Sequence, residues 1–124
     1  ATPTLVSATC DGQQATPSFT FYFGTVLVNG AAASPGTRIE LYNPRGERVG
    51  CAVTTAAGIY PYTRAYGEDS SANPPIAGMR AGEAVTFKVN GAVATTLPSP
   101  VIWQDDKATH AVDLSASPGA TATP

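Results

Sequence analysis

The chain has 124 residues and a formal net charge of -2, enough for one domain with a core of its own. Its seven basic residues are scattered and no apolar run is long enough to cross a bilayer, so we expect neither nucleic-acid binding nor a membrane span. Only 13% of the residues are charged, whereas 12 are Gly and 11 are Pro, a composition that favours a β-rich secreted domain over a helical one.

The first 17 residues are interpreted as an N-terminal extension. The chain begins Ala1-Thr2-Pro3, which is typical of a mature chain after removal of a leader, so we expect an extracellular or cell-surface location. One apolar pair in this extension predicts a short strand that either folds back on its own domain or adds to the sheet of a neighbouring copy. The residues of this strand are Thr4, Leu5, Val6, Ser7, Ala8 and Thr9.

Residues 18–115 are predicted to form an all-β domain, a β-sandwich of about seven or eight short strands. No segment shows an apolar period of 3.6 residues over two turns, so we expect no helix. The segments that alternate or are rich in β-branched and aromatic residues are 18–29, 37–42, 48–55, 59–66, 83–90, 92–97 and 107–115. The alternation predicts that 85, 87 and 89 face inward. It places 49, 51 and 53 on one side of their strand and 110, 112 and 114 on one side of theirs.

Three positions give local predictions within these strands. Gly24 indicates a bulge or bend, and Pro61 indicates an edge strand or a break. Asn90-Gly91 is the strongest hairpin signal in the chain. Residues 67–82 have a turn-like composition without periodicity and are expected to form a long loop of the kind that is often functional. Residues 116–124 (Ser, Ala, Pro and Thr with one Gly) read as a flexible linker or a glycosylated tail.

The two cysteines, Cys10 and Cys51, most simply form a disulfide in a secreted domain, with two buried free thiols as the alternative. The bond would close a loop of roughly 40 residues, worth about 3–4 kcal/mol on the chain-entropy model. If the side that carries Val49, Cys51 and Val53 is the core face, Cys51 points inward and can meet Cys10. A zinc site is not expected, because the chain has one histidine and its two cysteines are far apart.

Four stretches together resemble a family of bacterial surface modules, the carboxypeptidase-regulatory-like or transthyretin-like β-sandwiches. They are FGTVLVNG (23–30), PGTRIELYNPRGERVG (35–50), TTAAGIYPY (54–62) and AGEAVTFKVNGAVA (81–94). The resemblance covers residues 18–115 and implies an Ig-like sandwich that serves as a stalk, spacer, adhesive unit or fibre subunit. Some members of the wider group carry Lys–Asn cross-links, but Lys88 alternates with inward-facing residues and is expected to face solvent.

No catalytic, cofactor or metal site is expected. His110 is the only histidine and has no nucleophile in a recognisable motif beside it. The acidic pairs Glu68-Asp69 and Asp105-Asp106 lack the repeated spacing of a calcium loop, so we interpret them as solvated.

Two kinds of surface site are considered for a partner or a glycan. Tyr60, Tyr62 and Tyr66 share strand parity. With Trp103 they predict either an aromatic face for a sugar ring or a protein partner, or a part of the core. The sequence contains no Asn-x-Ser/Thr site for N-glycosylation, whereas Ser and Thr near Pro are candidates for O-linked glycans. The candidates are Thr2, Thr4, Thr16, Ser117, Thr121 and Thr123.

The function expected from these features is a structural subunit of an extracellular filament or surface assembly, in which copies of the chain are joined by strand addition. The strand at 4–9, with the disulfide at its root, is the predicted linking element, and the tail is the alternative. A carbohydrate-binding or adhesive module and a passive spacer are the competing functions.

Overall fold

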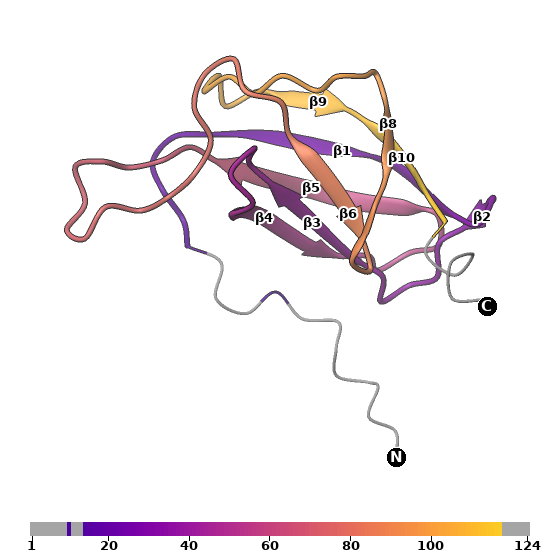
Figure 1. The fold of residues 1–124 in the computed structure, drawn as a ribbon. Helices are drawn as coiled ribbons and strands as arrows, with labels where there is room; N and C mark the ends of the chain where they lie inside the picture. Colours follow the sequence, from indigo (N-terminus) through magenta and orange to yellow (C-terminus); the bar gives the residue numbers. More distant parts are fainter. Residues whose placement is uncertain (1–9, 11–13, 118–124) are drawn as a thin grey trace.

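The computed structural model describes residue 10 and residues 14–117, and the described residues form ten β-strands in two sheets without a helix (Figure 1). The described part of the chain therefore contains no helix able to span a membrane. The strands are β1 (Phe19–Val28), β2 (Ala31–Ala32), β3 (Arg38–Tyr42), β4 (Arg48–Val53), β5 (Ile59–Tyr66), β6 (Thr86–Val89), β7 (Ala92–Val93), β8 (Thr95–Leu97), β9 (Thr109–Ala111) and β10 (Asp113–Ala116).

The first sheet is organised around β1. β5 and β2 pair with one side of β1 in antiparallel fashion, and β9 and β10 pair with the other side in parallel fashion. β8 pairs with β10 and forms the far edge. The second sheet has the order β4-β3-β6-β7, with every pair antiparallel.

The strand number exceeds the seven or eight expected from the sequence because two predicted segments each form two strands and Ala31–Ala32 adds the short strand β2. β7 and β8 are separated only by Ala94 and belong to different sheets. β9 and β10 are separated only by Val112 and follow the same side of β1. Since β7 runs on into β8, the chain crosses between the sheets along one border. Along another border β4 lies against β5, where the Cα of Gly50 approaches the Arg64 carbonyl closely.

One hydrophobic core lies between the two sheets. Val26 of the first sheet and Ile39 and Val89 of the second have no exposed surface. The rings of Tyr22 and Phe87 meet edge to face across the core, with centroids 5.4 Å apart. This all-β, two-sheet arrangement agrees with the fold class predicted from the sequence.

The local predictions at Gly24, Pro61 and Asn90-Gly91 are confirmed. The pairing of β1 with β5 is irregular between Tyr22 and Gly24, and β5 pairs with no strand other than β1. A proline is tolerated there because an edge strand leaves one row of N–H groups outside the ladder. Asn90 and Gly91 both have positive φ, 49° and 87°, and close the hairpin between β6 and β7.

The sets of residues predicted to share one side of a strand are only partly right. Val85, Phe87 and Val89 are buried as expected. In β4 an extra residue, Val49, lies between the partners of Leu41 and Tyr42, so the alternation shifts and Ala52 is buried while Cys51 and Val53 are half-exposed. Val112 and Leu114 are buried.

His110, interpreted from the sequence as a packing or a surface histidine, is exposed. All three residues of β9 are exposed, and among the described residues this strand pairs only with β1, at the edge of the sheet. The His110 ring contacts the Asp106 carboxylate at 2.9 Å. Burial alone would raise the pKa of the Asp106 carboxyl, but hydrogen bonds from the Ala108 N–H, the Thr20 hydroxyl and His110 hold that pKa below its usual range.

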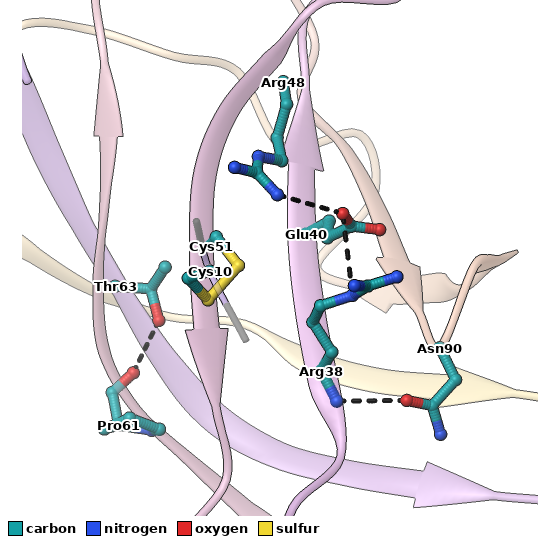
Figure 2. Close-up of a disulfide and its surroundings, with 8 residues drawn as sticks. All are labelled: Cys10, Arg38, Glu40, Arg48, Cys51, Pro61, Thr63 and Asn90. Atoms are coloured by element: carbon teal, nitrogen blue, oxygen red, sulfur yellow. Dashed lines mark hydrogen bonds and ion pairs between the residues drawn. A yellow bond between two sulfur atoms is a disulfide. The ribbon is translucent and has the colours of Figure 1, made fainter. Parts of the chain in front are cut away.

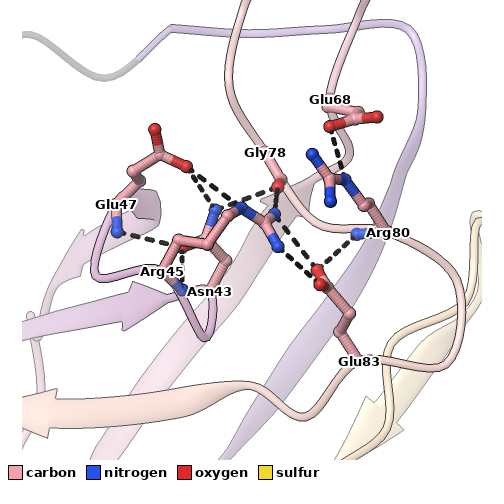
Figure 3. Close-up of polar contacts among 7 residues, drawn as sticks. All are labelled: Asn43, Arg45, Glu47, Glu68, Gly78, Arg80 and Glu83. Atoms are coloured by element: carbon pink, nitrogen blue, oxygen red, sulfur yellow. Dashed lines mark hydrogen bonds and ion pairs between the residues drawn. The ribbon is translucent and has the colours of Figure 1, made fainter.

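The loop at 67–82 is anchored to the turn between β3 and β4 by a polar network (Figure 3). The Gly78 carbonyl accepts hydrogen bonds from the Asn43 amide at 3.0 Å and from the Arg45 guanidinium at 2.8 Å. Arg45 also pairs with Glu83, which lowers the pKa of the Glu83 carboxyl. Arg80 donates to Glu68 at 2.9 Å. The network explains how a segment without periodicity keeps a defined path.

We predict that Gly50→Ala is strongly destabilising, because an added Cβ would lie 2.5 Å from the Arg64 carbonyl oxygen and would force β4 away from β5. The expected loss in the free energy of unfolding is on the order of 2–3 kcal/mol in urea denaturation. Gly46→Ala is the control, since its φ is 84° but its surroundings are open, so it reports backbone strain alone at about 1 kcal/mol. Equal losses in the two variants would contradict the close approach of β4 and β5.

Candidate interaction surface

The phenylalanines of β1 point away from the core, while a threonine and a tyrosine point into it. Phe19, Phe21 and Phe23 are half-buried on the outer side of the sheet. Thr20 and Tyr22, between them, are 1% and 2% exposed. The most apolar side chains of the strand therefore lie on the face that water or a partner contacts, which is the reverse of the usual alternation.

The inward position of Thr20 is stabilised by polar partners. Its hydroxyl donates to the Asp106 carboxylate at 2.7 Å and also lies 3.1 Å from the Ala108 carbonyl oxygen. Tyr22 fills the core against Phe87. Hydrogen bonding compensates the burial of the hydroxyl, so the sheet can keep the phenylalanines outside.

A bulge in β5 decides which tyrosines join these phenylalanines. Tyr22 pairs with Thr63 and Gly24 with Tyr60, so Pro61 and Tyr62 both lie opposite Phe23. The extra residue reverses the alternation of β5, so Tyr60 is 3% exposed whereas Tyr62 is 64% exposed. Tyr66, beyond the bulge, is half-buried on the outer side with Tyr62 and Arg64.

Two of the four aromatic residues considered for a surface face are buried. The Tyr60 hydroxyl donates to the Val112 carbonyl at 2.6 Å. Trp103 is 3% exposed, and its indole N–H donates to the Ala65 carbonyl at 2.8 Å. The shared strand parity of Tyr60 and Tyr62 was misleading because parity does not continue through a bulge. Tyr60 and Trp103 therefore belong to the core, where each side chain donates a hydrogen bond to a backbone carbonyl.

The aromatic side chains on the outer side form one connected group, which we call the outer aromatic face: Phe19, Phe21, Phe23, Tyr62 and Tyr66, grouped around Arg64. Phe23 and Tyr62 have centroids 5.1 Å apart, and Phe19 and Phe21 are 5.3 Å apart. The interplanar angles of its ring pairs are 70–76°. Neighbouring rings therefore cannot all present their flat sides to one planar ligand, which disfavours stacking on an extended sugar chain.

Cationic side chains lie over these rings. The Arg64 guanidinium is 5.1 Å from the centroid of Phe19 and 5.2 Å from that of Phe21. The Lys107 ammonium is 5.2 Å from the Phe19 centroid. These cation–π contacts order the exposed rings and give the face a positive component.

The disulfide predicted from the sequence is confirmed, with the Cα atoms of Cys10 and Cys51 5.6 Å apart (Figure 2). Cys51 does not point into the core, because the bulge at Val49 separates it from the buried side of β4. Cys51 instead lines a shallow concavity of the outer surface together with Phe21, Tyr62, Thr63, Arg64 and Tyr66. The disulfide thus lies at the border of the outer aromatic face.

Glu40, near this bond, is 7% exposed, and its carboxylate pairs with Arg38 and Arg48 (Figure 2).

The remaining predicted site residues divide into three groups. Thr16 is 7% exposed and its hydroxyl donates to the Gly67 carbonyl at 2.6 Å, so it is not available for the predicted O-glycosylation. Ser117 is exposed. The other predicted glycan positions and the predicted linking strand lie outside the described residues; they are Thr2, Thr4, Leu5, Val6, Ser7, Ala8, Thr9, Thr121 and Thr123.

No group of three or more His, Cys, Asp or Glu side chains is placed to hold a metal ion within residues 14–117 and Cys10. Glu68 is bound to Arg80, and the Asp69 carboxylate accepts hydrogen bonds from the hydroxyl and the N–H of Ser71. These hydrogen bonds lower the pKa of the Asp69 carboxyl. The acidic residues of the loop therefore serve its own conformation.

Comparisons with known proteins give no match: no family model, no curated protein and no solved structure resembles the chain significantly.

We predict that stability falls as the pH rises above about 10, because burial raises the pKa of the Tyr22 and Tyr60 phenols above their usual value, with the charges of Asp106 and Asp113 adding to the effect. The unfolded chain then releases protons that the folded chain keeps, so each buried tyrosine costs about 1.4 kcal/mol per pH unit. Tyr60→Phe should roughly halve this slope in urea denaturation between pH 10 and 11. The control Tyr62→Phe should leave the slope unchanged, and an unchanged slope in both variants would contradict the burial of Tyr60.

We also predict that reduction of the disulfide lowers the free energy of unfolding by about 4 kcal/mol, since the bond joins residues 41 apart in sequence. Urea denaturation with and without dithiothreitol measures this loss. The double variant Cys10→Ser, Cys51→Ser should show the same loss and no response to reductant. A loss below about 1 kcal/mol would mean that the bond constrains the unfolded chain little.

Proposed function

We propose that this chain is a structural domain of an extracellular assembly, without catalytic activity, and that its copies join through the outer aromatic face. In this proposal the two sheets form an Ig-like or transthyretin-like β-sandwich, and residues 4–9 act as the strand that links one copy to the next. The observation that carries the proposal is the outward placement of three phenylalanines on β1 while Thr20 is turned into the core. A contiguous group of half-buried rings around the exposed Tyr62 is the kind of apolar surface patch that marks an interaction site.

Two further features support an assembly role. The disulfide fits an oxidising compartment, as expected of a secreted or surface protein. Aromatic and arginine side chains, which make up this face, are also the residues that dominate the binding energy of protein interfaces. The ring angles favour an irregular protein surface over a planar sugar chain as the partner.

Sedimentation velocity of the full chain over a range of concentrations tests the proposal. We expect reversible or filamentous association, with fibres visible by electron microscopy. Phe21→Ser and Tyr62→Ser should each weaken association at least tenfold, because hot-spot aromatic residues contribute most of an interface's free energy. Val93→Ser is the matched control, since Val93 is 66% exposed on β7 of the second sheet.

A chain that stays monomeric at every concentration would overturn the proposal. Binding of a soluble oligosaccharide by that monomer, abolished by Tyr62→Ser, would establish the carbohydrate-binding alternative in its place. Association that Val93→Ser weakens as much as Phe21→Ser would exclude the outer aromatic face as the contact.

A further inference from the structure

We infer that the outer aromatic face binds the N-terminal segment, residues 1–9, of a second copy of the chain. This inference rests on the proposed function and names the partner of the same surface. Three features support it: the position of Cys10, the chemistry of residues 1–9 and the disulfide.

The residue that follows the segment, Cys10, lies at the border of the face. It is bonded to Cys51, which lines the same concavity as Phe21 and Tyr62. Along β1 the face extends from Phe19 to Phe23, about 13 Å at the rise of a strand. Nine extended residues span at most about 30 Å, so the segment is long enough to cross the face.

The chemistry of the segment suits the face. Residues 1–9 contain no charged side chain, and their bulky members are the adjacent Leu5 and Val6 among small Ala, Ser, Thr and Pro residues. Edge-to-face rings leave recesses that aliphatic side chains fill, whereas a sugar chain needs coplanar rings. Arg64 at the centre of the face presents N–H donors to backbone carbonyls of an extended segment. Thr109 and Ala111 of β9, small and exposed, pair with Phe21 and Phe23 and leave access from that side.

The disulfide favours a second copy over the same chain. Within one chain no load acts on a contact between the segment and the face, so a covalent bond at Cys10 would add no mechanical support to that contact. Between copies, tension on the segment would, without the disulfide, detach the residues that precede β1 from the domain. The bond to Cys51 transfers that tension directly to β4. A disulfide at this position is therefore most useful when the segment is held by a neighbour.

Photocross-linking of the full chain tests the inference. The variant Leu5→p-benzoylphenylalanine is prepared with ¹⁴N and with ¹⁵N, the two preparations are mixed under associating conditions and irradiated, and the linked peptides are identified by mass spectrometry. We expect links from position 5 to peptides containing Phe19–Phe23 or Tyr62–Tyr66, with pairs of mixed isotope present. The same photoreactive residue at Val93 is the control and should give no links to these peptides.

A pair of substitutions gives a second measurement. Leu5→Asp should weaken association at least tenfold in sedimentation velocity, because a carboxylate would have to leave water to enter the rings. Leu5→Ile keeps an aliphatic side chain and should change the affinity less than threefold. Equal association of Leu5→Asp and the unaltered chain would overturn the inference.

The outcomes separate this inference from the proposed function. Links to the face that occur only between peptides of the same isotope would place the segment on its own chain and overturn the inference. Association that depends on Phe21 and Tyr62 without links from position 5 to the face would also overturn it, together with the linking role of residues 4–9, while the outer aromatic face would stand as the contact between copies. A chain that does not associate at all would overturn both.

Discussion

The hydrogen-bonded ladders of β1 are the constraint on which the rest of the structure depends. Four other strands pair with this strand, β2 and β5 on one side and β9 and β10 on the other. Because both sides of β1 are occupied, its register fixes which of its side chains enter the core. Thr20, Tyr22 and Val26 are buried in that register, so Phe19, Phe21 and Phe23 must face outward. The outer aromatic face is a direct consequence of this pairing.

Two bulges then adjust what this register places on the surface. The bulge of β5 opposite Phe23 turns Tyr62 outward and leaves Tyr60 in the core, where its hydroxyl bonds the Val112 carbonyl. The bulge of β4 at Val49 turns Cys51 outward, toward the border between β4 and β5. Both irregularities add side chains to the same outer surface, so the disulfide and the aromatic rings become neighbours although they come from three strands.

Polar contacts stabilise the long loop and the edge of the first sheet, and Met79 of the loop also packs in the core. The Gly78 carbonyl, Arg45 and Glu83 fix the loop to the turn between β3 and β4. Asp106 binds the Thr20 hydroxyl and the His110 ring near β9. Asp106 and His110, considered from the sequence as candidates for chemistry, take part in these contacts.

The sequence by itself determined the β class, the disulfide partners, the hairpin at Asn90-Gly91, the edge position of Pro61 and the irregularity at Gly24. Each of these follows from composition or from a short-range rule about which residues tolerate a backbone conformation. Only the tertiary structure decided the direction of the side chains in β1, β4 and β5. Alternation predicts two faces but not which face is buried, and one extra residue in a strand reverses it. For that reason Trp103 and Tyr60 belong to the core, and the phenylalanines of the clearest predicted strand form the surface.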